Sequence, residues 1–173
     1  MVPASLIVDE KQKQTLTALV ITPTTLADIL ASKGLMGVIL ALVMSIVTML
    51  LNQAFGTQPG LLMMVLGLGA VLAALFGLML GSLVKDINTL FAVIKGTGIL
   101  LYAPVIVYMF PQIPQWIGKI FPTYYIVQPV VELSQQGGTW SDIAPEVTIL
   151  AGLILVLLSI VALVGRRARW QEA

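Results

Sequence analysis

One run without a charged residue, from Gly34 to Val84, limits what this chain can fold into more than any other feature. As a single helix the run would measure roughly 75 Å, whereas the hydrocarbon core of a bilayer is about 30 Å thick. The run must therefore cross a membrane twice. Amides, glycines and a proline accumulate over residues 52–60, and these turn-forming residues predict the reversal.

The rest of the chain continues this pattern. Hydrophobic residues make up 58% of it and charged residues 10%, and its mean hydropathy is +1.01, values far from those of a soluble domain. We predict an all-α polytopic transmembrane bundle with four spans, near residues 35–51, 61–84, 90–109 and 147–165. Lys85 and Asp86 interrupt the apolar sequence between the second and third spans, and three arginines follow the fourth.

An even number of spans places both termini on the same side of the membrane. Of the nine basic residues, all but Lys119 fall on that side. The positive-inside rule therefore predicts a multi-pass plasma-membrane protein with both termini in the cytoplasm. The first residues lack the basic and apolar segments of a cleavable signal peptide.

The inventory of side chains excludes several kinds of site. The chain has no cysteine and no histidine, so disulfides, thiolate or imidazole metal sites and Ser-His or Cys-His nucleophiles are excluded. The G-x-x-x-x-G-K-[ST] phosphate loop is also missing, and a net charge of +1 supplies no basic stripe for nucleic acid. We predict no catalytic, metal or cofactor site, and therefore no enzyme.

Small residues recur every four positions in the first two spans, a spacing that lets helix backbones approach closely. This spacing indicates packing between neighbouring spans of one chain or, alternatively, a dimer face. The residues are Gly69, Ala73, Gly77 and Gly81 in the second span and Gly37, Ala41 and Ser45 in the first.

Residues 110–146 are too numerous for a minimal turn and too apolar for a solvated loop. They contain half of the aromatic residues, which favour the membrane interface, and prolines divide the segment into two short helices near residues 114–120 and 123–136. We predict a re-entrant or interfacial helical hairpin. It either seals the outer surface or forms a lid over an exit path, with Tyr124, Tyr125, Gln128 and Glu132 as outer gate candidates.

Residues 1–33 precede the spans and contain a short amphipathic helix. Thr15 to Thr22 can place Leu16, Leu19 and Val20 on one face, and Pro23 ends the helix. A second helix then starts near Thr25 and Asp28 and runs into the first span. The resulting cytoplasmic elbow is either a membrane-surface anchor or a docking site for a protein, and the few nearby lysines favour a protein.

The order of these features resembles the type-two ABC exporter permeases, the membrane subunits of drug, sodium, lipid and polysaccharide exporters. The resemblance covers nearly the whole chain. It rests on Glu10-Lys11, Thr15-Leu16, Leu19, Pro23 and Lys33-Gly34, on the outer segment Phe121-Pro122-Thr123-Tyr124-Tyr125, and on the terminal arginines. In that family the stretch matching residues 10–23 is a coupling helix that docks on a separate nucleotide-binding subunit.

The resemblance therefore implies that Leu16, Leu19 and Val20 face a groove on an ATPase, with Glu10 and Lys11 at its rim. ATP and Mg²⁺ would bind to that partner and not to this chain. Such permeases usually have six spans, with two before the coupling helix. A second polypeptide could supply that pair, the chain could be a fragment or degenerate copy, or a four-span form could assemble differently.

Two functions from different classes follow. The leading hypothesis is the permease subunit of an ATP-driven exporter, working as a homodimer or beside a companion permease. The alternative is a truncated or accessory membrane protein that assembles with a permease without transporting by itself. The spans are apolar apart from a few hydroxyls, which is consistent with a hydrophobic substrate and equally with plain packing.

Overall fold

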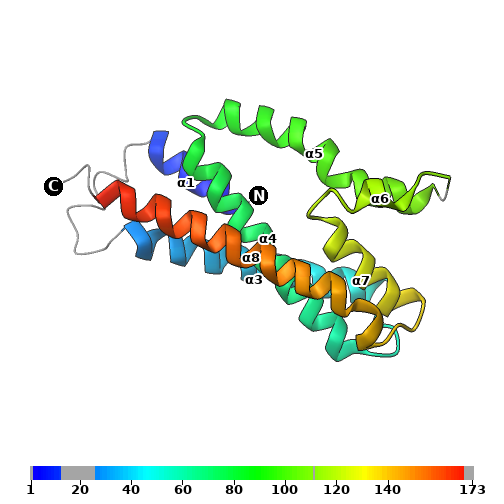
Figure 1. Ribbon diagram of the computed structural model, residues 1–173. Helices are drawn as coiled ribbons and strands as arrows, with labels where there is room; N and C mark the ends of the chain where they lie inside the picture. The colour runs from blue at the N-terminus through cyan, green and yellow to red at the C-terminus, as the bar shows by residue number, and fades with distance from the viewer. Residues whose placement is uncertain (1, 13–25, 111, 170–173) are drawn as a thin grey trace. The chain divides into compact units, whose positions relative to one another are not determined.

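The computed structural model describes residues 2–12, 26–110 and 112–169, and every regular element within these ranges is an α-helix (Figure 1). Four helices are long and apolar enough to cross a bilayer, which confirms the predicted all-α fold with four spans. They are α3 (Leu26–Leu51), α4 (Pro59–Leu83), α5 (Ile87–Met109) and α8 (Trp140–Arg169). The shorter helices are α1 (Val2–Gln12), α6 (Gln115–Gly118) and α7 (Tyr124–Gln135).

The reversal between α3 and α4 occurs where the turn-forming residues accumulate. Pro59 occupies the first position of α4, where the missing N–H of proline costs no helical hydrogen bond. Gly56 has a φ of +62°, and a Cβ at this position would overlap the carbonyl oxygen of Leu133. Glycine is thus required both by the backbone conformation and by the close approach of α7.

Asp86 fixes the start of α5. Its carboxylate accepts hydrogen bonds from the backbone N–H of Thr89 at 2.8 Å and from the Thr89 hydroxyl at 2.6 Å. These bonds hold the pKa of Asp86 below its usual value, with the hydroxyl contact as the main cause. The polar interruption between the second and third spans is therefore a helix cap.

α8 begins at Trp140, well before residue 147, where the sequence predicts the fourth span to start. The backbone N–H and hydroxyl of Thr139 both donate to Oδ2 of Asp142, at 2.7 and 2.8 Å. This arrangement is a short form of the capping box, in which a residue three positions into the helix reaches back to the cap. Residues 140–146, predicted as part of the outer segment, therefore belong to the helix of the last span.

α1 is a second difference from the sequence analysis, which predicts no helix before Thr15. It belongs to the first of two compact units, which comprises Met1–Ala41, Ala70–Val93 and Ile154–Ala173. Ala4, Ile7 and Val8 are buried. α1 packs closely against three glycines, Gly37 of α3 and Gly77 and Gly81 of α4. A Cβ at Gly37 would overlap the ring of Pro3, and a Cβ at Gly81 would lie 2.9 Å from Cα of Ala4.

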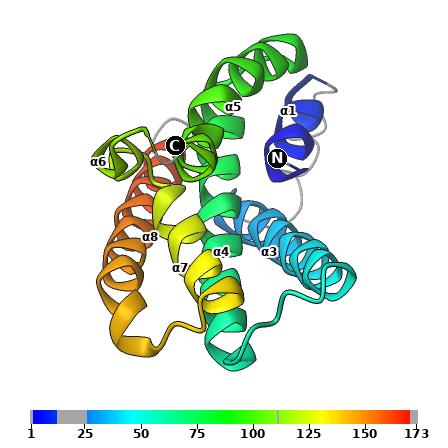
Figure 2. The same ribbon diagram turned by 90° about the vertical axis from the view of Figure 1, so that its right-hand side faces the viewer.

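The second unit comprises Leu42–Gly69 and Ile94–Leu153. Its apolar core gathers one face from each of three helices, and Figure 2 shows α7 beside the first turns of α4 and α8. The core residues are Leu62, Val65 and Leu66 of α4, Leu133 of α7, and Ile143 and Val147 of α8. This core holds α7 in place and so positions the candidate site described below.

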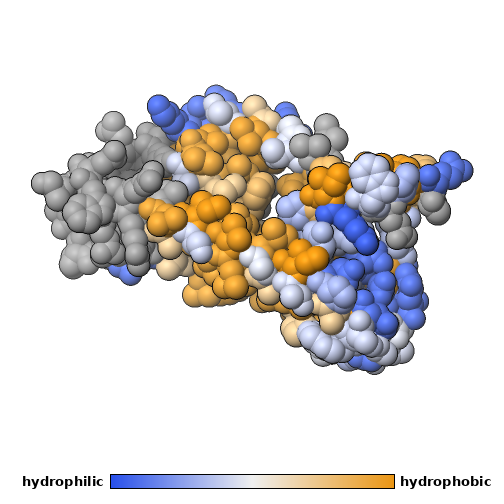
Figure 3. Space-filling model, viewed as in Figure 1, coloured by the Kyte–Doolittle hydropathy of each residue, from blue (hydrophilic) through white to orange (hydrophobic). Residues whose placement is uncertain are grey.

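The four spans differ greatly in burial. In α4, 56% of the most apolar window is buried, compared with 6% in α3 and 17% in α8. Figure 3 shows apolar residues lying open along α8. Such continuous apolar surface suits contact with acyl chains, as expected for a multi-pass membrane protein.

Candidate functional site

A pocket of about 320 Å³ lies in the second unit, between α5 and α7. Its α5 wall consists of Pro104, Val107 and Tyr108. Its α7 wall consists of Tyr124, Val127 and Gln128, and Ile113 completes the lining. Apolar walls with a few polar groups are typical of small-molecule sites, and this volume lies near the lower end of their range.

Tyr124 is held in the pocket wall by its neighbours on α6. A Cβ at Gly118 would lie 2.9 Å from Cδ2 of Tyr124, so glycine lets the ring pack closely against α6. Tyr125 makes an edge-on contact with Tyr124, with ring centroids 5.5 Å apart, and its hydroxyl donates to the carbonyl of Lys119 at 2.9 Å. These contacts turn the two adjacent tyrosines in different directions.

Two carboxylates act on this wall. Nε2 of Gln128 donates to Oε1 of Glu132 at 2.8 Å, one turn further along α7. Oε2 of Glu146 on α8 is buried and has no hydrogen-bond partner among the described residues. Burial, then the charges of Glu146 and Glu132, raise the pKa of the Tyr124 hydroxyl.

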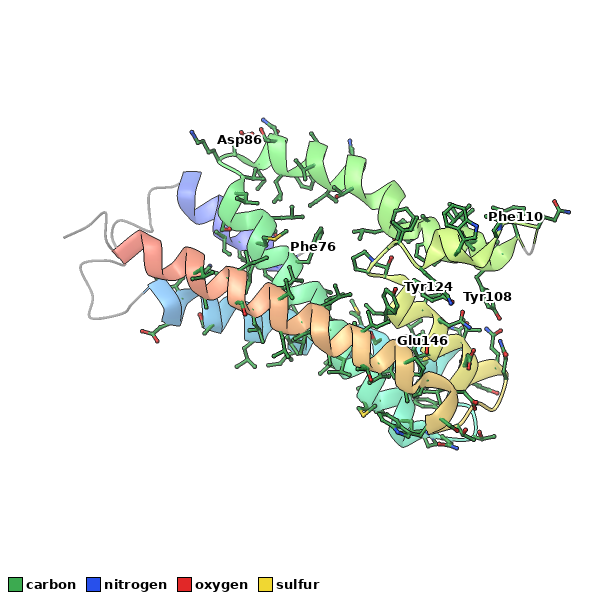
Figure 4. The ribbon with its side chains drawn as sticks, in the orientation of Figure 1. Phe76, Asp86, Tyr108, Phe110, Tyr124 and Glu146 are labelled. Atoms are coloured by element: carbon green, nitrogen blue, oxygen red, sulfur yellow. The ribbon has the colours of Figure 1, made fainter. Side chains whose placement is uncertain are left out.

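The position of Glu146 follows from the helical pattern of α8. Ile143, Val147 and Leu150 are buried and are spaced to share one face of α8. Glu146 is three residues after Ile143 and four before Leu150, a spacing that places it on the same face. It therefore lies on the face that packs against α7. Figure 4 draws the Glu146 side chain close to Tyr124, and the effect of its charge on that phenol agrees with this placement.

The structure brings the predicted outer gate residues together on α7. Tyr124 and Gln128 line the pocket. Glu132 accepts a hydrogen bond from Gln128, and Tyr125 donates one to the backbone carbonyl of Lys119. Gln135 and Gln136, at the end of the same helix, are exposed. α7 ends as the sequence predicts, since Gly137 has a φ of +66° and the N–H of Gly138 donates to the carbonyl of Glu132 at 3.0 Å.

The small residues predicted for helix packing divide between the two units. In the second unit, a Cβ at Gly69 would lie 3.0 Å from Cγ2 of Ile126 on α7. In the first unit, Gly77 and Gly81 face α1, whereas Ala73 is exposed. Gly69 therefore packs against α7, whereas Gly77 and Gly81 pack against α1. The four-residue spacing alone does not show which helix each glycine contacts.

The predicted coupling residues Thr15, Leu16, Leu19, Val20 and Pro23 lie outside the described residues. Glu10 and Lys11 belong to the last turn of α1, and their side chains are also outside the described part. In the ranges that the structure describes, no cluster of acidic side chains could hold a metal ion.

Sequence reasoning missed Glu146, Tyr108 and Pro104. The signal for Glu146 was present, because the cap at Thr139 and Asp142 predicts a helix, and the apolar period from Ile143 onward places Glu146 on its buried face. Tyr108 and Pro104 look like ordinary residues of a third span. Only the packing of α7 against α5 makes them part of a pocket.

Comparison with known proteins identifies the family. A family model described as "Fluoroquinolones export permease protein Rv2686c-like" matches residues 1–164, nearly the whole chain. No curated protein and no solved structure matches the chain. The resemblance to ABC exporter permeases is thereby confirmed, and the chain is a multi-pass membrane protein of an export permease family. With its four membrane-length helices and a match that extends over all of them, this chain belongs to the Rv2686c-like family of fluoroquinolone export permeases.

Proposed function

We propose that the chain is the membrane-spanning subunit of an ATP-driven exporter and that it transports fluoroquinolone-like compounds. The observation that carries this proposal is the family match over residues 1–164. Fluoroquinolones are planar aromatic acids that bear a basic amine. A pocket lined by both apolar and polar surface, with two tyrosines and an amide, suits the size and character of such a compound.

In this proposal ATP and Mg²⁺ bind to a separate ATPase subunit, which docks on the stretch from Glu10 to Pro23. Leu16, Leu19 and Val20 form its apolar contact, and Glu10 and Lys11 lie at the rim. Closure of the ATPase would push this stretch and, through α1 before it and α3 after it, move the spans. The working complex is a homodimer or a pair with a companion permease.

We place both termini in the cytoplasm, as the distribution of basic residues favours. α7 and the pocket then lie toward the outer leaflet, where Tyr124, Tyr125, Gln128 and Glu132 form an outer gate. The hydrogen bond between Gln128 and Glu132 supports a role for this pair as one polar unit at the mouth of the path.

Docking is tested by copurification with the ATPase. Leu16→Asp places a charge on the proposed contact and should abolish copurification while membrane insertion stays normal. Ala18→Asp, which adds the same charge on the opposite face of the predicted helix, is the matched control. Copurification that survives Leu16→Asp would undo the assignment of this stretch.

Export is tested in inverted membrane vesicles that contain the native complex. ATP should drive accumulation of a fluoroquinolone, and a non-hydrolysable analogue should not. Glu132→Ala should change the rate or selectivity of export by an amount that abundance does not explain. Unchanged transport by a normally abundant Glu132→Ala variant would contradict the outer gate.

A further inference from the structure

One oxygen of the half-buried Glu146 side chain presents a problem that the described part of the fold does not solve. Its Oε2 atom is shielded from solvent and has no hydrogen-bond partner among the described residues. A buried charge is costly unless it is paired, and an ionisable residue within a membrane protein commonly marks a path for substrate or ions. The missing partner of Glu146 is therefore expected to be a cation that arrives from outside the chain.

The described residues of the second unit supply no buried cation beside Glu146. Glu132, the second carboxylate near Tyr124, is bonded to the neutral amide of Gln128, which leaves its charge uncompensated. The basic residues of the second unit, Lys95 and Lys119, both have exposed side chains. Two negative charges thus act on one wall of the pocket without a basic side chain buried among them.

The pocket beside these charges is shaped for an aromatic body. Tyr108 and Tyr124 stand on its two walls, and Pro104 and Val107 add apolar surface between α5 and α7 (Figure 4). Aromatic rings attract organic cations through their negative faces and also stack on flat aromatic ligands. A nearby carboxylate and two tyrosines together favour a flat ligand that carries a positive charge.

We propose that this pocket binds the aromatic substrate by its protonated amine, with Glu146 as the counter-ion and Tyr124 and Tyr108 against the ring system. The proposal rests on the export function above for its substrate class, and it adds the residue that selects the charge. Glu132 and Gln128 form the second polar contact. An analogue of similar shape that lacks the protonated amine would leave Glu146 unpaired and should bind less well.

The test measures binding to the full chain in lipid nanodiscs without ATP, using a fluoroquinolone with a free piperazine nitrogen and its N-acetyl derivative. The derivative keeps the ring system and loses the cation. The wild-type chain should bind the free amine about tenfold or more tightly, and Glu146→Gln should remove this preference. Asp28→Asn, which removes one negative charge from α3 in the other unit, should leave the preference unchanged.

Three further variants keep the test decisive if Glu146→Gln folds poorly. Gln128→Lys would place a tethered ammonium at the pocket wall, and it should weaken binding of the free amine while sparing the derivative. Tyr124→Ala should weaken both ligands, and Tyr124→Phe should bind both normally. Equal binding of the two ligands by the wild-type chain, or an undiminished preference in Glu146→Gln, would overturn the site.

Failure of the site and failure of export are separable. Charge-selective binding without ATP-driven uptake in vesicles would refute the export function and leave the cation site standing. Conversely, ATP-driven export with equal rates for the two ligands would support the transporter and overturn the role of Glu146.

Discussion

The hydroxyl of Thr123 donates a hydrogen bond of 2.9 Å to the carbonyl oxygen of Leu101, and this bond joins the start of α7 to the middle of α5. Leu101 lies three residues before Pro104, which has no N–H and whose ring crowds the carbonyls of the preceding turn. In membrane helices a threonine hydroxyl can satisfy backbone groups that a proline displaces. Thr123 thus holds together the two helices that form the pocket.

Removal of this bond should loosen α7. We expect Thr123→Val to lower the free energy of unfolding in detergent by about 1 kcal/mol, because the acceptor loses its donor in a partly buried place. Thr148→Val is the matched control, since the Thr148 hydroxyl bonds only within its own helix, to the carbonyl of Ala144 at 2.7 Å. Equal losses in the two variants, measured by thermal unfolding, would argue against a special role for Thr123.

The turn between α3 and α4 should tolerate glycine replacement unevenly. Gly56→Ala would strain the positive φ and force the carbonyl of Leu133 away, so we expect a loss of stability of about 2 kcal/mol or more. Gly60→Ala should be neutral or slightly stabilising, because no atom lies within 4 Å of a Cβ there. Unfolding of the two variants side by side measures the difference, and comparable stabilities would contradict the packing of α7 on this turn.

The packing of α1 against α3 and α4 can be tested by disulfide cross-linking. The chain has no native cysteine, so only the introduced cysteines can form the bond. A Cβ at Gly77 would lie 3.8 Å from Cβ of Pro3, a separation that suits a disulfide. We expect a chain with Pro3→Cys and Gly77→Cys to form the bond on mild oxidation, as measured by mass spectrometry after proteolysis.

A third substitution shows whether the glycine contact places α1. Adding Gly37→Leu should prevent the disulfide, because its side chain would fill the space that residue 3 needs beside α3. Adding Gly96→Leu should not, since nothing lies within 4 Å of a Cβ there. Oxidation that proceeds equally in both backgrounds would show that α1 does not depend on this contact.

The cap of α5 should give a pH-dependent contribution to stability. The folded pKa of Asp86 lies below the ordinary 3.8, so its contribution is complete above that value and is lost as the pH falls through the lowered folded pKa. We therefore expect the difference in melting temperature between wild type and Asp86→Asn to shrink below about pH 4. Thr89→Val should show the same trend, and a difference that stays constant down to pH 2 would contradict the cap.

The spans could be predicted because they depend on local composition. The uncharged run from Gly34 to Val84 predicts two crossings, and the turn-forming residues between them lie where α3 ends and α4 begins. The start of α8 could not be placed by hydropathy alone, because Asp142 and Glu146 make residues 140–146 look like a loop. The cap at Thr139 decides that boundary, and hydropathy does not register it.

Only the α7 wall of the pocket could be predicted from the sequence. The polar and aromatic pattern of α7 indicates Tyr124 and Gln128, because both lie within one short segment. The opposite wall, Pro104 and Tyr108, and the charge at Glu146 belong to other helices that are distant in the sequence. A single sequence does not show that these helices pack together. A small residue such as Gly118 indicates a close contact, but the sequence does not show which residue it contacts.

The close packing of α1 on Gly37, Gly77 and Gly81 affects how motion can be transmitted through this part of the chain. Within a membrane, apolar contact between helices gains little over contact with acyl chains, so such packing depends on shape more than on hydrophobicity. A fit of this kind is stable only when nearly complete, since even one added methyl group at Gly37 would overlap Pro3. A small displacement of α1 would therefore forfeit most of its contacts with these glycines, so the helix transmits force mainly while it stays in place.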